Sequence, residues 1–409
     1  MAFPPGGQAI LNALNANSPA PALPENEEEW QQFLDLVVMH RLGPLMHERL
    51  AQGPLGRAMP ASVKEWLRES HRRTTLRNLG ICRQLVTVTR LLRDAGIPSV
   101  ALKGAFLAFF AYRAPGLRPM RDLDLLVQPQ DAVRAFEVMK SHGYRAGFDG
   151  APEAYFADRI HLPPLVGPEG IALELHHRLT PPDLPHFRGF EAHLWSRCIR
   201  KTLGGMEILF PRGEDMLLHL CVHAALDHQL DLGPLALMDI AMLIEAESLD
   251  WHDFLRCVDD GHWRRCVLPP LYLAERHLGA KVPRAVIDAL GAGEGSADWV
   301  GDAEYLLFSD SRDHRVLDYG VQDMLYSPRW SERLARLVGA AFPPRTVIAR
   351  HFPVRSDSVS AYLYYPRRWY RLVTGKLPAL LRVHSGGAAS LRQLAIRRRA
   401  FLKWLNEES

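Results

Sequence analysis

The residues with the clearest chemical potential lie in the run 118–127, where two aspartates are separated by one leucine. If this run is a β-strand, Asp122 and Asp124 point to the same face, because strand side chains alternate between faces. Two adjacent carboxylates repel each other, so either one keeps a proton or a cation lies between them. Magnesium or manganese suits such a pair, since hard divalent cations prefer oxygen ligands and leave positions open for phosphates. The spacing predicts a metal site that binds the phosphates of a substrate.

A third carboxylate is expected to complete this site, and Glu174 is the best candidate. It lies in the alternating run 171–176, so Glu174 and His176 would share one strand face. Carboxylates around divalent cations suit an in-line phosphoryl displacement. One of the three carboxylates, or a nearby histidine such as His176, is then a candidate to take the acceptor proton, and His176 is also a candidate to contact the acceptor.

A second motif joins a predicted strand to a predicted helix through Lys103 and Gly104. The glycine would let the backbone approach a ligand, and the helix start would offer free N–H groups to a phosphate. Arg118 and Arg121 stand just before the aspartates, and a guanidinium binds phosphate through two parallel hydrogen bonds. We expect these four residues to bind phosphates.

Each motif also has a simpler interpretation. An Asp-x-Asp pair is common on exposed strands, Lys103 could simply end a strand, and Arg121 could simply pair with Asp122. The order along the chain favours a functional site: strand, glycine turn, helix, acid pair on the next strand, and acid on a later strand.

Apolar spacing predicts the elements that position these residues. A long helix is expected from Pro60 to Gly96. Short apolar runs bounded by turn formers predict strands at 98–103 and 122–127 and a hairpin of 161–166 with 171–176. Further helices are expected at 105–112, 131–141, 235–245 and 251–258, with another starting at 213.

Together, the motifs resemble the uncharacterised bacterial nucleotidyltransferase family of the DNA polymerase beta-like superfamily. They are Leu102-Lys-Gly104, the run 118–127, His142-Gly-Tyr144 and Leu173-Glu-Leu-His176. The resemblance spans roughly residues 85–180, with weaker echoes at 237–241 and 361–365. It implies a nucleoside triphosphate substrate such as ATP, and magnesium held by Asp122, Asp124 and Glu174. Lys103-Gly104 departs from the superfamily's usual Gly-Gly or Gly-Ser turn, which alters the expected grip on triphosphate.

The implied fold is α+β, with a small mixed sheet flanked by helices. With 409 residues, the chain is too long for one ordinary core, so several parts are expected. They are a flexible lead-in (1–25), a helical N-terminal segment (26–95), a nucleotidyltransferase core (96–210), a mostly helical C-terminal domain (211–340) and a basic helical tail (341–409).

Four potential metal ligands surround one predicted helix: His219, Cys221, His223 and His228. A zinc site would need a further ligand, for which Asp227 or Asp239 could serve. The histidines could instead be packed residues with satisfied hydrogen bonds. A third interpretation has His223 and Asp239 line the cleft and contact the acceptor or the base, as in the small-molecule nucleotidyltransferases that this chain resembles in layout.

Five widely spaced cysteines without a Cys-x-x-Cys pattern fit a reduced cytoplasm. Cys257, His262 and Cys266 lack the fourth ligand and the short paired spacing of a structural metal site. The first residues have no signal-peptide pattern, and no run of about 18 apolar residues occurs. We therefore expect a cytoplasmic protein without a transmembrane segment.

The segment 345–403 carries 13 Lys or Arg and one acid, Asp357, with aromatic residues interleaved. It could be a helical face packed on the net acidic remainder of the chain. It could instead bind nucleic acid through phosphate contacts and stacking, or lie on an anionic membrane surface.

The sequence thus predicts a metal-dependent enzyme that moves a nucleoside monophosphate from a triphosphate to an acceptor hydroxyl or phosphate. Two alternatives stay open. One is a kinase-like phosphotransferase on the same site, and the other is an inactive nucleotide-binding or scaffold protein.

Overall fold

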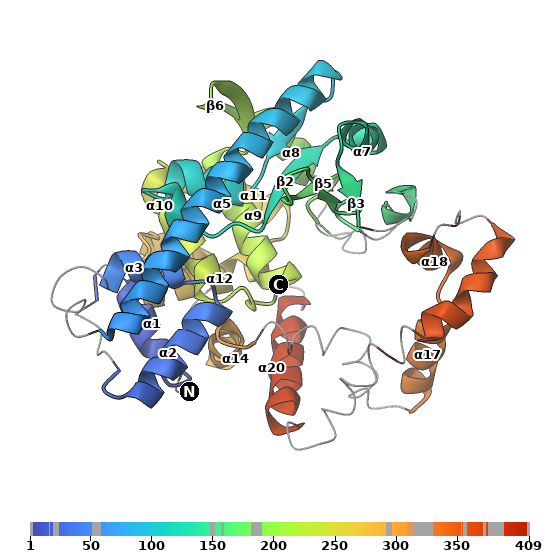
Figure 1. The fold of residues 1–409 in the computed structure, drawn as a ribbon. Helices are drawn as coiled ribbons and strands as arrows, with labels where there is room; N and C mark the ends of the chain where they lie inside the picture. The colour runs from blue at the N-terminus through green and yellow to red at the C-terminus, as the bar shows by residue number, and fades with distance from the viewer. Residues whose placement is uncertain are drawn as a thin grey trace.

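The structure is a computed structural model of the 409-residue chain (Figure 1). It describes residues 3–15, 17–18, 24–50, 59–147, 152–156, 159–180, 190–291, 297–310, 313, 330–352, 354, 358–370, 374 and 388–406.

Seven strands form one mixed sheet in the order β3-β4-β5-β2-β1-β7-β6. They are β1 (Ser99–Ala101), β2 (Asp122–Val127), β3 (Arg145–Ala146), β4 (Leu165–Val166), β5 (Ala172–His176), β6 (Ile199–Leu203) and β7 (Met206–Phe210). The central strand β2 runs antiparallel to β1 and parallel to β5, and β1 runs parallel to β7. The predicted α+β fold with a small mixed sheet is confirmed.

Helices precede the sheet and lie between its strands. They are α1 (Gly7–Leu14), α2 (Glu27–Met39), α3 (Gly43–Leu50), α5 (Ala61–Asp94), α6 (Gly104–Phe106), η1 (Leu107–Ala111), η2 (Pro115–Leu117), η3 (Pro129–Asp131), α7 (Ala132–Ser141), η4 (Pro152–Tyr155) and α8 (Phe190–Arg197). The long helix α5 packs against β1, β2 and β7 and is visible along its whole length in Figure 1.

After β7 the described chain is helical, as predicted. The elements are α9 (Gly213–Val222), η6 (His223–Asp227), α10 (Pro234–Ala246), α11 (Trp251–Asp260), α12 (Arg264–Leu278), α13 (Arg284–Ala289), α14 (Ala297–Leu307), α17 (Trp330–Ala341), α18 (Arg345–His351), η7 (Val359–Tyr364) and α20 (Ala388–Asn406). Helix α10 packs against both α9 and α12 and touches η1 beside the sheet. This contact brings the helical half of the chain against the sheet.

Within the predicted flexible lead-in of residues 1–25, the structure has a helix at Gly7–Leu14. Helix α1 lies there, and its Ile10, Leu11 and Leu14 are buried in the main core. The run of Pro, Ala, Asn and Gly around α1 conceals three apolar side chains at helical spacing, which is enough to fix one short amphipathic helix against a core. Helix α2 begins as predicted, with the Asn26 side chain accepting a hydrogen bond from the Glu29 backbone N–H.

Two further segments differ from expectation. The predicted helix 105–112 is one short turn, α6, followed by the π-helix η1. Strands β6 and β7 were not predicted, although they form a hairpin at the edge of the sheet. Gly204 and Gly205 between them both have positive φ, the conformation of a two-residue hairpin turn, so the Gly-Gly pair between two short runs was the available signal.

Part of the basic tail packs on the rest of the chain. Helix α20 contacts α14 and α12, Arg397 pairs with Asp302 at 2.6 Å, and the rings of Trp404 and Trp299 stack. The packing interpretation therefore holds for α20, while contact of the tail with nucleic acid or an anionic membrane stays a prediction. Among the described helices, none is long and apolar enough to cross a membrane.

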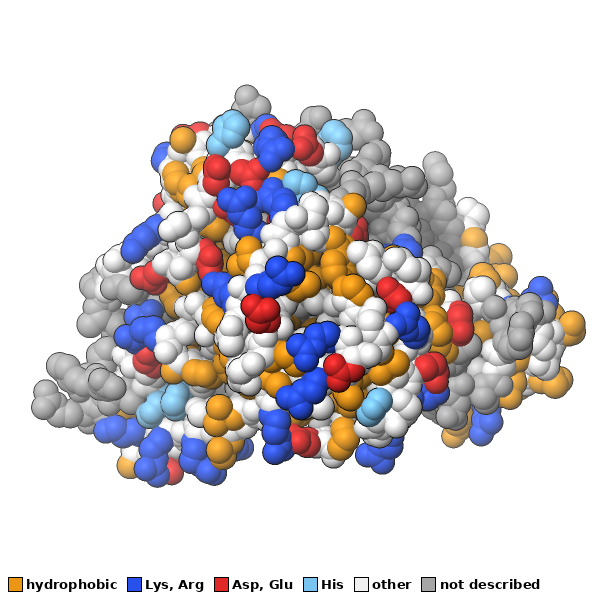
Figure 2. Space-filling model, turned by 90° about the horizontal axis from the view of Figure 1, so that it is seen from above, with side chains coloured by type: hydrophobic (Ala, Val, Ile, Leu, Met, Phe, Trp, Pro, Cys, Tyr) orange, Lys and Arg blue, Asp and Glu red, His pale blue; other side chains and the backbone are white. Residues whose placement is uncertain are grey.

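Charges of both signs are interspersed over the face drawn in Figure 2, with apolar side chains between them. This distribution agrees with the formal net charge of +3. Charged side chains of both signs also line a cavity beside the sheet.

Candidate active site

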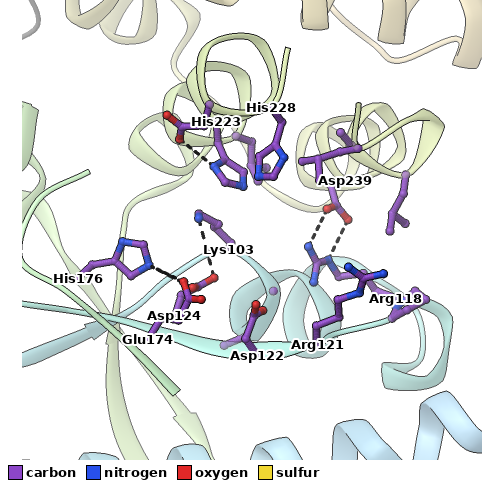
Figure 3. A pocket seen from close by; sticks show the side chains of 18 of the residues that line it. Lys103, Arg118, Arg121, Asp122, Asp124, Glu174, His176, His223, His228 and Asp239 are labelled. Carbon is purple, nitrogen blue, oxygen red and sulfur yellow. Dashed lines mark hydrogen bonds and ion pairs between the residues drawn. The ribbon is translucent and has the colours of Figure 1, made fainter. Parts of the chain in front are cut away.

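The carboxylates of β2 and β5 line a cavity of about 380 Å³ between the sheet and the helices that follow it (Figure 3). The opposite wall comes from α9, η6 and α10. All the site residues expected from the sequence line this one cavity: Lys103, Gly104, Arg118, Arg121, Asp122, Asp124, Glu174, His176, His223 and Asp239. The structure therefore brings them together, while the role of each stays a prediction.

The register of β2 and β5 explains how three carboxylates meet. Asp122 and Asp124 share one face of β2, while Leu123 and Leu125 are buried on the other. Strand β5 runs parallel beside it, with Glu174 directly opposite Asp124 and His176 opposite Leu126. Because opposite residues of paired strands point to the same face, Glu174 joins the two aspartates.

Among the three acids, Asp124 is the one whose ionised form its neighbours stabilise most. Its Oδ1 lies 3.1 Å from His176 Nε2, and its Oδ2 lies 3.9 Å from Lys103 Nζ. Burial raises the pKa of Asp124, but Lys103 and the bond to His176 outweigh burial and hold this pKa well below its usual range. Asp124 is therefore ionised at neutral pH.

Asp122 is placed differently on the same strand. Burial, followed by the negative charges of Asp124 and Glu174, raises the pKa of Asp122 to about 6. Lys103 and Arg118 offset only part of this effect. The carboxylate that lacks a close cationic partner is thus the one that gains most from a bound cation.

The same residues fit a divalent cation. Asp124, Glu174 and His176 each offer one ligand atom, and these atoms all lie within 4.8 Å of one another. Asp122 adds a further carboxylate on the same face. Carboxylate oxygens suit magnesium and manganese, and an imidazole beside them is a ligand that manganese accepts more readily than magnesium.

His176 is buried and connects the two acids. Its Nε2 lies 3.7 Å from Glu174 Oε2 as well as 3.1 Å from Asp124. Burial lowers the pKa of His176, but the bonds to Asp124 and Glu174 outweigh it, so this pKa lies above its ordinary value. His161 approaches Glu174 from the neighbouring segment at 3.7 Å.

Lys103 is held in an uncommon backbone conformation. Its φ is 39° and its ψ is −107°, a region that residues other than glycine seldom adopt. The side chain is buried, and it extends between Asp124 and the helical wall that carries His223 (Figure 3). Strained residues of this kind concentrate at functional sites, where the surrounding structure imposes the conformation.

Position 104 requires a glycine for a structural reason that the sequence did not indicate. A Cβ atom there would lie 2.4 Å from Arg118 Nη1 and 3.1 Å from Met120 Sδ. The glycine leaves room for the guanidinium of Arg118, rather than only for a ligand. The helix start beyond it is a single turn of three residues.

Arg118 and Asp239 form a two-pronged ion pair across the cavity. Arg118 Nε donates to Asp239 Oδ1 at 3.0 Å and Nη2 donates to Oδ2 at 2.8 Å. The Tyr112 hydroxyl donates to the same Oδ1 at 2.8 Å. Both members of the pair are largely buried, so the pair joins α10 to the loop before β2. A role for Arg118 in phosphate binding, or for Asp239 in acceptor binding, stays a prediction.

Two other arginines line the cavity without such a partner. Among the residues that the structure describes, neither Arg41 nor Arg121 has a side-chain hydrogen bond or ion pair. Arg121 was expected from the sequence, and its simple pairing with Asp122 is not seen. Arg41 lies between α2 and α3 and was not expected, because no local pattern indicates that this turn reaches the sheet.

The helical wall presents two histidine–carboxylate pairs. His223 Nδ1 lies 2.9 Å from Asp227 Oδ2, and His228 Nδ1 lies 2.9 Å from Asp231 Oδ1. Burial and the charge of Lys103 hold the pKa of His223 well below its ordinary value, so its imidazole is neutral at pH 7. The cleft interpretation of His223 is supported by its position in the cavity wall.

The alternative metal clusters do not form among the described residues. His219, Cys221, His223 and His228 are not grouped as ligands there, and Cys221 is buried in the core. Cys257 does not meet His262 and Cys266 either, but lies with His193 and Asp215. Arg197 is already in that group, with Nη1 2.6 Å from His193 Nε2 and Nε 3.3 Å from Asp215 Oδ2.

Comparison with known proteins agrees with this geometry. No curated protein matches the chain. The family model described as uncharacterised nucleotidyltransferase matches residues 26–279, more than half of the 409 residues, from α2 to the end of α12. The matched region contains every residue that lines the cavity. The chain therefore belongs to the uncharacterised nucleotidyltransferase family.

Proposed function

We propose that this protein transfers the nucleoside monophosphate of a triphosphate, such as ATP, to a hydroxyl or phosphate of an acceptor. An acceptor oxygen attacks the α-phosphorus, the bond from this phosphorus to the bridging oxygen breaks, and pyrophosphate leaves. The observation that supports the proposal most is the convergence of Asp122, Asp124 and Glu174 on one face of two neighbouring strands.

In this proposal Asp122, Asp124 and Glu174 hold magnesium or manganese, with His176 beside them. When bound, such a cation neutralises negative charge that develops on the phosphate oxygens. Lys103 adds a fixed positive charge between the carboxylates and the helical wall, where it attracts a phosphate. Its burial keeps the ammonium in place without further ordering.

The acceptor proton goes to His223 in this proposal. A carboxylate on Nδ1 favours the tautomer that carries its proton on Nδ1, which leaves the Nε2 lone pair free to accept one. Asp227 then stabilises the imidazolium that forms. His176 is a poorer base, because its bonds to Asp124 and Glu174 already raise its pKa and favour its charged form.

Pyrophosphate release tests the proposal. The full chain is incubated with each nucleoside triphosphate, magnesium or manganese, and an acceptor-containing cell extract from which macromolecules have been removed. Asp122→Asn and Asp124→Asn are each expected to abolish the release of pyrophosphate while keeping the far-ultraviolet circular dichroism of the wild type. Asp94→Asn, on the exposed end of α5, is the matched control and keeps full activity. Wild-type release from either site variant refutes the proposal.

A further inference from the structure

The cavity has a positive end that the carboxylate chemistry does not use. Arg41, Arg118 and Arg121 all line it, together with Asp239. Asp239 takes two N–H groups of Arg118, so the charge of that arginine is compensated. Arg41 and Arg121 then remain as two guanidinium groups without a carboxylate partner among the described residues.

These guanidinium groups lie close enough to repel one another. Burial, followed by the positive charges of Arg121 and Arg118, lowers the pKa of Arg41 to about 10. The acids Asp239 and Asp122 face the same group and offset only part of this effect. Arg41 is half-buried and Arg121 is exposed, and both line the same cavity. Like charges held this close together favour a bound anion.

The backbone at Arg41 has a conformation that favours glycine. Arg41 follows the end of α2 with a φ of 57°. Helices that end in this left-handed conformation usually place glycine or asparagine there, because the Cβ atom of other residues is strained. An arginine at such a position costs stability, unlike a glycine.

The neighbours of Arg41 hold it firmly against the helical half of the chain. His40 is buried, its ring packs edge-on against Phe308, and a Cβ atom at Gly233 would lie 2.1 Å from its Nδ1. Leu42 on the other side is fully buried. The turn is therefore fixed at both flanks, and the arginine between them faces the cavity.

The loop that carries Arg121 is fixed as well. Arg77 on α5 donates from Nε to the backbone oxygen of Met120 at 3.0 Å and from Nη2 to that of Arg121 at 2.6 Å. Asn78, also on α5, donates to the backbone oxygens of Pro115 and Arg118. The backbone that carries each free guanidinium group is thus fixed, which lowers the cost of binding a multiply charged anion.

We propose that Arg41 and Arg121 form a clamp for the two phosphates that are not transferred, so that the N-terminal helical segment completes the substrate site. This inference rests on the proposed function, because it names where the leaving pyrophosphate lies. A guanidinium donates several N–H groups to phosphate oxygens, and two of them match the charge of a diphosphate better than that of a single phosphate.

Calorimetric titration of the full chain with inorganic pyrophosphate, in the presence of magnesium, tests the clamp. Arg41→Gly and Arg121→Gln are each expected to weaken pyrophosphate binding by about tenfold or more, as for a lost charge-assisted contact. Both variants keep the affinity for adenosine monophosphate within about twofold of wild type. Arg90→Gln, on the exposed surface of α5, removes the same charge elsewhere and changes neither affinity.

The glycine variant separates binding from folding. Arg41→Gly relieves the positive φ, so its melting temperature is expected to equal or exceed that of the wild type while pyrophosphate binding falls. A wild type that binds no pyrophosphate, or two variants that bind it with unchanged affinity, overturns the clamp. So does a lowered melting temperature of Arg41→Gly together with intact binding by Arg121→Gln.

Failure of the clamp and failure of the proposed function give different results. If only the clamp is wrong, the variants release pyrophosphate from a triphosphate with an unchanged KM. If only the proposed function is wrong, pyrophosphate binds through both arginines, but the wild type releases none from any triphosphate.

Discussion

Asp122 and Asp124 are two residues apart on one strand, yet their surroundings differ in sign. Lys103 and His176 lie against Asp124 and lower its pKa. At Asp122 the charges with the largest effect on the pKa are the carboxylates of Asp124 and Glu174, which raise it. The sequence indicates that the pair shares a face but gives no means of ranking the two acids. Their ranking depends on β5 and on the lysine at the end of β1, which the fold brings into place.

This asymmetry predicts opposite effects on the stability of the metal-free protein. The folded-state pKa of Asp122, about 6, is above its ordinary value, so ionisation weakens the fold as pH rises from about 4 through 6. Asp122→Asn should therefore raise the free energy of unfolding at pH 7 by about 3 kcal/mol, measured by urea denaturation with a chelator present. The gain should vanish near pH 4.

Asp124→Asn should change the free energy of unfolding in the opposite direction. The folded-state pKa of Asp124 is depressed, so its charge stabilises the fold above its unfolded pKa, and that stability is lost as pH falls. This variant should lower the free energy of unfolding at pH 7. Changes of the same sign for both variants at pH 7 would contradict the electrostatic account of the pair.

The sequence does not show which arginines of the cavity have a carboxylate partner. Arg118 and Arg121 look equivalent beside the aspartates, but Asp239, more than a hundred residues away in the chain, pairs with only one of them. Arg41 has no sequence signal at all, since a left-handed arginine after a helix looks like any charged turn residue. Long-range pairing of this kind is set by tertiary packing.

At the scale of elements, the predicted strands at 98–103 and 122–127 and the hairpin are confirmed, because short apolar runs between breakers are reliable signals. Helix α5 likewise matches its predicted bounds closely. Register is different: the parallel pairing of β2 with β5 joins segments about fifty residues apart, and local spacing does not specify it. That pairing is what turns an acid pair into a three-carboxylate site.

The ion pair of Arg118 with Asp239 should stabilise the contact between α10 and the loop before β2. Breaking a buried pair leaves one charge uncompensated, so Asp239→Asn is expected to cost about 3 kcal/mol in the free energy of unfolding. Tyr112→Phe, which removes one hydrogen bond from the same carboxylate, should cost only about 1 kcal/mol. Equal losses for the two variants, or none for Asp239→Asn, would show that the pair does not join these elements.

At the scale of the whole molecule, the family match ends at residue 279, but the packed structure continues. Helix α20 buries Phe401 and Leu405, and its Trp404 stacks on Trp299 of α14. The basic composition of α20 predicts a charged surface helix and does not indicate that one of its faces is apolar. One face of α20 is nevertheless part of the main core.

Removal of α20 should therefore destabilise the rest of the chain. A variant that ends before Ala388 is expected to lose about 3 kcal/mol or more of unfolding free energy, because several large apolar side chains lose their buried contacts. Chemical denaturation followed by tryptophan fluorescence measures this loss. An unchanged denaturation midpoint would mean that α20 is not part of the folded core.

The central claim concerns which phosphorus atom is attacked. The most direct measurement gives the full chain ATP labelled at the α-phosphate or at the γ-phosphate, with magnesium or manganese and an acceptor extract, and follows the label. Nucleotidyl transfer predicts that the α-label enters the acceptor and that the γ-label leaves in pyrophosphate, with neither transfer occurring in Asp124→Asn. Entry of the γ-label into the acceptor, without the α-label, would contradict the account.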